Sequence, residues 1–377
     1  MSTSMQTART ASDNHRLHPA LAPGSVIGII GGGQLGRMLV LAAARLGYRC
    51  HIYSPEPDAP AMQVTDRHTV ADYEDRDALL RFARQVDVVT YEFENIPRHT
   101  AAIVAEVVPV RPSPQVLAIC QDRIAEKTFL RSIGVPTAAS CAVGNAAQLN
   151  LALRTIGRPA VLKLARLGYD GKGQLAIGEQ SAAEAWAQMK IEDGEADGIL
   201  EAWVDFAIEI SIIIARSEAG DTSAYIPVEN VHENHVLRHT RAPAVIDPGL
   251  AVAAEAYARR IAEELGLIGI LCVEMFVTRD GRLLVNELAP RPHNSGHWTI
   301  DACVVSQFEQ CIRAVAGLPL GSPERHADAF MENLLGDEVD RWRELLVDPA
   351  AHLHLYGKNA ARPGRKMGHV TWIRPRS

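Results

Sequence analysis

The chain has 377 residues, a length that predicts two or three domains rather than one. Its 38 Lys and Arg residues are outnumbered by 45 Asp and Glu residues, and only 5% of all residues are aromatic. A net charge of −7 without many stacking side chains argues against a dedicated nucleic-acid-binding protein. The six cysteines form no C-x-x-C pair, so we expect neither a disulfide framework nor a zinc site, and a reducing cytoplasm is the simplest location.

Residues 1–24 are rich in Ser, Thr, Ala, Asn, His and Pro, and they lack the continuous apolar segment of a secretory signal. We therefore expect a disordered leader. No segment approaches the roughly 18 consecutive apolar residues of a membrane span, so no membrane partner is expected.

The segment 25–119 alternates between short β-branched runs and helical patterns. Strands are predicted over residues 26–30, 49–53 and 86–91, and helices over residues 37–46 and 75–85. Alternation of this kind indicates a parallel sheet, so we expect a Rossmann-like domain here.

A glycine turn, Gly31-x-Gly33-x-x-Gly36, joins the first predicted strand to the first helix. Glycines at this spacing let backbone N–H groups approach an anion at the helix N-terminus, as in dinucleotide-binding proteins. Such proteins also need an acidic residue at the end of the second strand. Glu56 is the candidate here, but it follows Pro55 and is therefore expected in the loop after the strand. Three interpretations of the glycine turn therefore stay open: it binds a nicotinamide cofactor, it binds another phosphate-bearing ligand, or it has a purely structural role.

A second domain is expected over residues 120–320, because the pattern changes near residue 120 to an amphipathic helix. The predicted elements are helices over 124–133 and 250–265 and strands over 160–164, 204–215 and 271–288. Residues 321–377 would then form a small C-terminal domain.

Within the strand region 271–288, Asp280-Gly281 lies between two apolar runs, which is the pattern of a two-residue hairpin turn. A loop of these two residues sets Glu274 directly opposite Glu287. Two facing carboxylates among apolar neighbours repel each other, and a divalent cation such as Mg²⁺ removes this cost. The alternative is a pair that points to solvent or binds a nearby arginine.

Lys163 lies inside an apolar strand, where a buried ammonium group needs an anionic partner. The loop that follows, residues 168–174, has three glycines and Lys172, a composition that can fold over phosphates. A lysine that reaches solvent and an ordinary hairpin are the alternatives. With the carboxylate pair, these features indicate nucleotide phosphoryl transfer, although the chain has neither a Walker A sequence nor protein-kinase motifs.

Four motifs, in order, carry a resemblance to a known enzyme family. They are Gly33-Gln34-Leu35-Gly36-Arg37-Met38, Gly168-Tyr169-Asp170-Gly171-Lys172-Gly173-Gln174, the run from Asn286 to His297, and the run from Arg362 to His369. Over residues 25–377 the chain resembles the ATP-grasp superfamily and, within it, the 5-(carboxyamino)imidazole ribonucleotide synthases. The resemblance implies an α/β ATP-grasp fold with an N-terminal Rossmann-like parallel-sheet domain, a lid around residues 136–203 and a small C-terminal domain.

The reaction implied by the resemblance belongs to purine biosynthesis and is that of a ligase that forms a C–N bond. ATP would phosphorylate bicarbonate to carboxyphosphate, and the amine of 5-aminoimidazole ribonucleotide would capture the carboxyl group. The implied partners are these small molecules, without nucleic acid or membrane, and a cytoplasmic homodimer is expected.

The same resemblance places ATP, as co-substrate, between the lid and the core of the second domain. The residues assigned to ATP are Arg123, Lys163, Gly168, Tyr169, Asp170, Gly171, Lys172, Gly173, Gln174, Glu201, Ala202, Trp203, Val204, Glu209, His232, Asn286 and Glu287. Two Mg²⁺ ions are assigned to Glu274 and Glu287, the carboxylates that the hairpin turn pairs.

The resemblance also implies catalytic and ribonucleotide-binding residues. The catalytic set is Arg291, Lys163, Asp170, His293 and Asn294, with Arg291 expected to hold bicarbonate and carboxyphosphate. The ribonucleotide set is Gln34, Leu35, Glu92, Tyr169, Asp170, Arg291, His293, Asn294, Ser295, Lys358 and Arg365. In this interpretation the glycine turn binds the ribonucleotide and not a nicotinamide cofactor.

Residues 358–377 contain six basic residues and no acidic ones, and such a local basic strip suits a small phosphate-bearing substrate. For Arg365 the alternative is a solvated basic tail. Other functions that stay open are a formate-dependent glycinamide ribonucleotide transformylase, a nicotinamide-dependent oxidoreductase and a non-catalytic nucleotide sensor.

Overall fold

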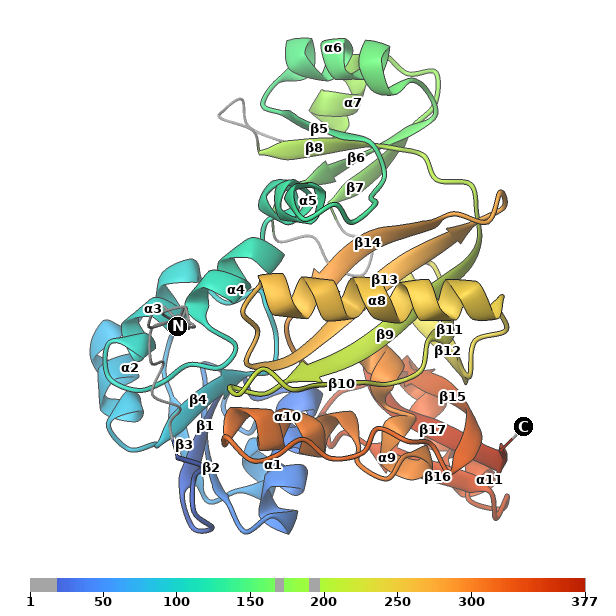
Figure 1. Cartoon of the computed structure of the whole chain (residues 1–377). Helices are drawn as coiled ribbons and strands as arrows, with labels where there is room; N and C mark the ends of the chain where they lie inside the picture. The colour runs from blue at the N-terminus through green and yellow to red at the C-terminus, as the bar shows by residue number, and fades with distance from the viewer. Residues whose placement is uncertain (1–18, 167–172, 190–196, 377) are drawn as a thin grey trace, which may run out of the picture.

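Three β-sheets organise the part of the chain that the computed structural model describes, residues 19–166, 173–189 and 197–376 (Figure 1). The N-terminal elements are β1 (Val26–Ile30), α1 (Gln34–Arg45), β2 (Arg49–Ser54), η1 (Met62–Val64), β3 (Arg67–Val70), α2 (Arg76–Ala83), β4 (Val88–Tyr91) and α3 (Arg98–Ala105). Their strands form a parallel sheet in the order β3-β2-β1-β4. The parallel sheet predicted from the alternating pattern is confirmed.

The sequence pattern does not predict β3, whose residues are alternately half-buried and exposed. This strand pairs with β2 at the edge of the sheet. An edge strand with a solvated face carries few buried apolar residues, so the hydrophobic signal that indicates the other strands is weak there.

The second sheet is antiparallel, and α6 and α7 cover one of its faces (Figure 1). The elements of this part are α4 (Pro114–Cys120), α5 (Arg123–Ser132), β5 (Ser140–Val143), α6 (Ala146–Ile156), β6 (Ala160–Leu164), β7 (Gln174–Ile177), α7 (Ala182–Met189) and β8 (Gly198–Ala202). The strand order is β5-β8-β6-β7. Lys163 pairs with Gln174 across β6 and β7, so the predicted hairpin that flanks the glycine loop is confirmed.

The third and largest sheet has nine strands in the described residues and lies between α8 and α10 (Figure 1). Its elements are β9 (Phe206–Arg216), β10 (Thr222–Ala224), β11 (Val228–Glu233), β12 (Val236–Ala242), α8 (Pro248–Glu264), β13 (Gly269–Thr278), β14 (Leu283–Ala289), η2 (Asn294–Gly296), α9 (Thr299–Ala302), α10 (Gln307–Val315), β15 (Ala327–Leu335), η3 (Gly336–Arg341), α11 (Trp342–Leu345), β16 (Ala351–Leu355) and β17 (Lys366–Pro375). β15 pairs with β12, so the C-terminal strands extend this sheet. None of the helices in the described residues is long and apolar enough to cross a membrane.

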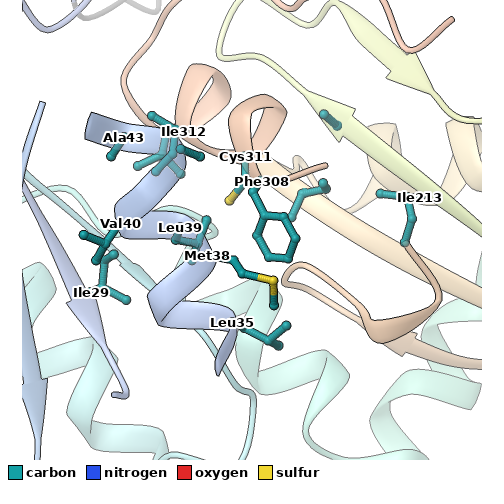
Figure 2. Close-up of a cluster of buried hydrophobic side chains, with 14 of the residues drawn as sticks. Ile29, Leu35, Met38, Leu39, Val40, Ala43, Ile213, Phe308, Cys311 and Ile312 are labelled. Atoms are coloured by element: carbon teal, nitrogen blue, oxygen red, sulfur yellow. The ribbon is translucent and has the colours of Figure 1, made fainter. Parts of the chain in front are cut away.

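A shared hydrophobic core joins the N-terminal sheet to the large sheet (Figure 2). Met38 and Leu39 of α1 lie in one buried cluster with Phe308 and Ile312 of α10. Burial of each such side chain contributes about 1.5–3 kcal/mol. This core fixes the position of the N-terminal sheet relative to the large sheet.

The hairpin between β13 and β14 differs from the prediction at its turn. Val277 pairs with Leu283, and the backbone N–H of Thr278 donates a 2.9 Å hydrogen bond to the carbonyl of Arg282. The loop is therefore one residue longer than the predicted Asp280-Gly281 turn. Gly281 adopts φ +78°, the left-handed conformation that closes a three-residue hairpin loop.

Glu274 nevertheless pairs with Glu287, as predicted. The register shifts by one residue between Glu274 and Met275, where a β-bulge leaves Asn286 as the extra residue of β14. The bulge compensates for the longer loop, so the predicted pair is correct although the predicted turn is wrong.

Candidate active site

The two hairpin carboxylates contact different basic residues, a histidine and an arginine. Oε1 of Glu274 lies 2.9 Å from Nε2 of His293, and Oε2 of Glu287 lies 3.0 Å from Nη1 of Arg123. Binding of one carboxylate to an arginine is the alternative that the sequence left open. Burial alone raises the pKa of Glu287, but Arg123 and two lysines more than offset this effect and lower it. Glu287 is therefore an ionised oxygen donor at neutral pH.

The helix α5 supplies the groups that hold the bulged part of β14. The Lys127 ammonium donates to the backbone carbonyl of Asn286, and Oε2 of Glu126 accepts a 2.7 Å hydrogen bond from the backbone N–H of Leu288. Backbone groups on the outer side of a buried edge strand need such partners. Lys127 is 1% exposed and Glu126 2% exposed, so the protein interior fixes the backbone on both sides of Glu287.

Lys163 on β6 has the buried anionic partner that its apolar strand requires. Its Nζ lies 2.6 Å from Oε2 of Glu201 on β8, and Nζ of Lys127 lies 3.8 Å from Oε1 of the same carboxylate. Burial raises the pKa of Glu201, but the two lysines bring it below its ordinary value. This network connects the small sheet to the metal-binding candidates of the large sheet.

Glu209 on β9 and His232 on β11 form a second pair beside the hairpin. Oε2 of Glu209 lies 2.6 Å from Nδ1 of His232, and Glu209 pairs with Phe276 of β13. Burial lowers the pKa of His232, but the hydrogen bond to Glu209 and the charge of Glu274 raise it above its ordinary value. Both predicted ATP residues thus lie next to Glu274.

The predicted adenine-binding segment borders a pocket of about 480 Å³. Its lining includes Ala202, Trp203 and Val204 of this segment and Leu284 of β14. Trp203 is 52% exposed. A pocket of this size between two sheets is within the range of small-molecule sites.

Arg291 connects the large sheet to the N-terminal domain. Its Nη2 donates a 2.8 Å hydrogen bond to Oε1 of Glu94, and its Nε donates to Oε2 of the same carboxylate. Burial lowers the pKa of Arg291, but the Glu94 carboxylate more than offsets this effect and raises it. The two-point contact fixes the plane of a charged guanidinium group.

The segment after Arg291 brings three predicted residues together. Nδ1 of His293 lies 2.8 Å from Oγ of Ser295, while its Nε2 faces Glu274. Asn294 is 8% exposed, and neither side-chain polar atom has a hydrogen-bond partner among the described residues. Buried amides are nearly always hydrogen-bonded, so this one is available to a ligand.

Glu92 lies just after β4, and its side-chain carboxylate is bound by the backbone of the glycine turn. It accepts a 2.7 Å hydrogen bond from the backbone N–H of Gly36 and another from that of Gly33. A Cβ added at Gly33 would lie 2.6 Å from Oε1 of Glu92, so a larger residue there would displace the carboxylate. The carboxylate fills the anion position at the start of α1, which leaves no room there for the pyrophosphate of a nicotinamide dinucleotide.

Lys358 brings the C-terminal part of the chain to the glycine turn. Burial, followed by the nearby charge of Arg365, lowers the pKa of Lys358 to about 8, and Glu92 acts in the opposite direction. The Lys358 ammonium donates a 2.7 Å hydrogen bond to the carbonyl of Lys366, and Nη1 of Arg365 donates a 2.9 Å hydrogen bond to the carbonyl of Ala360. The predicted phosphate residues and Glu92 therefore lie in one region.

The remaining predicted residues divide into two groups. Gln34 begins α1, while the Leu35 side chain is buried in the core of Figure 2, so only its backbone is left to contact a ligand. In the loop after β6, Gly173 and Gln174 are described, whereas Gly168, Tyr169, Asp170, Gly171 and Lys172 lie outside the described residues.

Three residues of the site were not among those predicted: Glu94, Glu126 and Lys127. Glu94 pairs with Arg291 across 197 positions, and Lys127 reaches Asn286 across 159 positions. Neighbouring charged residues in an amphipathic helix are usually solvated. Only the tertiary structure shows that α5 turns its Glu-Lys pair toward the edge of a sheet.

Three family matches cover most of the chain. Residues 25–121 match the ribonucleotide synthetase preATP-grasp domain, residues 128–308 the ATP-grasp domain, and residues 329–377 the phosphoribosylaminoimidazole carboxylase C-terminal domain.

Whole-chain comparisons agree with these matches. An N5-carboxyaminoimidazole ribonucleotide synthase of Brucella melitensis is 49% identical over 361 residues, which cover 95% of this chain and 99% of the relative. That of Bacillus subtilis is 45% identical, with 93% and 92% covered. Among solved structures, an ADP complex of N5-carboxyaminoimidazole ribonucleotide synthetase has a TM-score of 0.90 at 42% identity, covering 94% of each chain. An Aspergillus clavatus synthase in complex with ADP and 5-aminoimidazole ribonucleotide has a TM-score of 0.86 at 31% identity, also covering 94% of each chain.

Proposed function

Since the chain belongs to the N5-carboxyaminoimidazole ribonucleotide synthase family of ATP-grasp ligases, we propose a role for each part of its site in the carboxylation of 5-aminoimidazole ribonucleotide. The observation that carries the proposal is the position of the Glu274–Glu287 pair. It is linked through Arg123 to α5 and through His293 to the segment that follows Arg291.

ATP is proposed to bind between the small sheet and the large sheet. The adenine would enter the pocket beside Trp203, and Glu209 would accept hydrogen bonds from ribose hydroxyls. Lys163 and Arg123 would contact the phosphates, and each already lies against a carboxylate that a phosphate can replace as partner. Glycine-loop residues 168–172, outside the described residues, are proposed to cover the phosphates.

Glu274 and Glu287 are proposed to hold Mg²⁺, with two ions expected. Carboxylate oxygens from adjacent strands, one of them held ionised by cations, fit the hard oxygen ligands that Mg²⁺ prefers. Bound with ATP, the metal would neutralise charge on the phosphates.

The chemical steps need positioning and charge neutralisation rather than a protein nucleophile. A bicarbonate oxygen attacks the γ-phosphorus of ATP, the bond to the β-phosphate oxygen breaks, and carboxyphosphate and ADP form. The ribonucleotide amine then attacks the carboxyl carbon, the bond from that carbon to the phosphate oxygen breaks, phosphate leaves, and the amine loses a proton. Arg291 and the unpartnered amide of Asn294 are proposed to hold the carboxyphosphate, with His293 and Ser295 beside them.

The ribonucleotide is proposed to bind at the glycine turn, with its phosphate near Lys358 and Arg365. Glu92 and the backbone of Gln34 and Leu35 would contact its base and ribose, together with Tyr169 and Asp170. The carboxylate in the turn argues against the nicotinamide alternative, and the whole-chain relatives argue against a formate-dependent transformylase.

The test measures phosphate release and incorporation of labelled bicarbonate, with and without 5-aminoimidazole ribonucleotide. We expect the ribonucleotide to stimulate ADP formation and to acquire the label. Absence of both effects would disprove the proposed reaction. The domain boundaries near residues 120 and 320, a homodimer and a cytoplasmic location stay predictions.

A further inference from the structure

Next to the proposed Mg²⁺ ligands, three side chains form a cluster of different chemistry. Cys272, Glu274 and His293 each direct one ligand atom into a group whose members all lie within 4.8 Å of one another. Cys272 and Glu274 share a face of β13, because they lie two residues apart in an unbulged stretch of the strand. His293 follows β14 and closes the group from the adjacent loop.

The donor set is one that borderline-soft divalent cations prefer. A thiolate, an imidazole nitrogen and a carboxylate are typical zinc ligands, whereas Mg²⁺ prefers oxygen alone. Tetrahedral Zn²⁺ with bonds of about 2.0–2.3 Å places its ligand atoms about 3.5 Å apart, so small side-chain rotations suffice here. Three protein ligands leave the fourth position for water.

The surroundings orient these ligands. Oγ of Ser295 lies 2.8 Å from Nδ1 of His293, which leaves Nε2 directed toward Glu274. The same hydroxyl lies 3.9 Å from Sγ of Cys272. Outer hydrogen bonds of this kind fix the ring of a metal-binding histidine. Cys272 is fully buried, but the Glu274 and His293 side chains are each 14% exposed and provide an approach.

We propose that Cys272, Glu274 and His293 form a binding site for a thiophilic divalent cation such as Zn²⁺, and that occupancy of this site inhibits the ligase. Binding replaces the thiol proton of Cys272, which leaves to solvent. Inhibition rests on the proposed function, because the ion would remove Glu274 from Mg²⁺ and His293 from the carboxyphosphate region. Metal binding itself does not rest on that function.

The binding test titrates the purified, metal-free protein with Co²⁺ as a spectroscopic probe and then displaces it with Zn²⁺. We expect a thiolate-to-cobalt charge-transfer band in the wild-type protein that Zn²⁺ abolishes. Cys272→Ala should lose the band and weaken Zn²⁺ binding about 100-fold or more, since even outer partners contribute 10–100-fold. Cys303→Ala, which removes another buried cysteine, should keep both. A band that survives in Cys272→Ala, or its absence from the wild type, would overturn the site.

The inhibition test compares the same variants under saturating Mg²⁺–ATP. Micromolar Zn²⁺ should inhibit wild type and Cys303→Ala, whereas Cys272→Ala should keep its basal rate and need at least tenfold more Zn²⁺. If Cys272→Ala does not fold, Cys272→Ser serves in its place. Equal Zn²⁺ sensitivity of wild type and variant would disprove inhibition through this site. The cobalt band reports metal binding independently of ligase activity. If the protein shows the band but has no ligase activity, the proposed function is wrong and the metal site is still supported.

Discussion

The Lys127 ammonium donates a hydrogen bond to the backbone carbonyl of Asn286, the extra residue of the bulge that sets Glu287 opposite Glu274. Glu126 binds the same strand two residues further on, at the N–H of Leu288. A helix near the start of the second domain therefore determines where a proposed metal ligand of the hairpin lies.

Replacement of Lys127 by methionine should destabilise the protein. The change removes the cation that lies 3.2 Å from the buried Glu126 carboxylate, and removal of one partner of a buried ion pair costs about 3–5 kcal/mol in free energy of unfolding. The double variant Lys127→Met/Glu126→Gln should recover part of this loss, because it removes the buried charge. Urea denaturation of the three proteins measures both effects. A single variant as stable as wild type, or a double variant no better than the single one, would contradict the role assigned to this pair.

Replacement of Glu287 by glutamine should abolish most of the activity while the fold stays intact. The amide keeps the size of the side chain but removes a charge proposed to bind Mg²⁺, and a metal contributes several kcal/mol to charge stabilisation. We expect kcat to fall at least about 100-fold, and circular dichroism should show a folded protein, although loss of the ion pair with Arg123 lowers the melting temperature. Glu264→Gln, at an exposed position of α8, is the matched control. Normal turnover in Glu287→Gln would rule out the metal assignment.

Glu94 should act as a positioning residue for Arg291. In Glu94→Gln the guanidinium loses its charged two-point partner, so we expect the KM for bicarbonate to rise about tenfold and the KM for ATP to stay constant. Glu94→Asp should restore part of the loss, because it returns the carboxylate. Steady-state kinetics with each substrate varied in turn distinguish this result from general damage, which would change both KM values.

Much of the fold follows from local sequence signals, whereas the site depends on distant contacts. Strand and helix alternation predicts the N-terminal parallel sheet, and the hairpin pattern predicts the pairing of Glu274 with Glu287. The turn prediction is wrong because the loop has three residues, and the pairing of the two carboxylates is correct only because a bulge shifts the register back by one residue. Neither the longer loop nor the bulge has a distinct local signal in the sequence.

The ion pairs of the site could not be predicted for a related reason. Whether Glu94 is a solvated residue at a strand end or the partner of Arg291 depends on how the N-terminal sheet packs against the large one. That packing arises from apolar side chains of α1 and α10, which do not specify which polar groups they bring together.

Lys358 should make ribonucleotide capture depend on pH. Burial and nearby cations lower the pKa of its ammonium group to about 8, so the group is mostly charged at pH 7 and mostly neutral at pH 9. If it binds the substrate phosphate, kcat/KM for 5-aminoimidazole ribonucleotide should fall about tenfold over this interval, since this ratio reports ionisations of the free enzyme.

The variants Lys358→Arg and Lys358→Ala separate this charge from other ionisations. Arginine stays charged throughout the interval, so Lys358→Arg should show a flatter pH profile for the ribonucleotide. Lys358→Ala should have a higher KM for the ribonucleotide than wild type at pH 7, with the KM for ATP unchanged. Profiles for ATP serve as the internal control in all three proteins. An unaltered fall in Lys358→Arg would assign the ionisation to another group, and an equal rise of both KM values in Lys358→Ala would exclude a specific contact with the substrate phosphate.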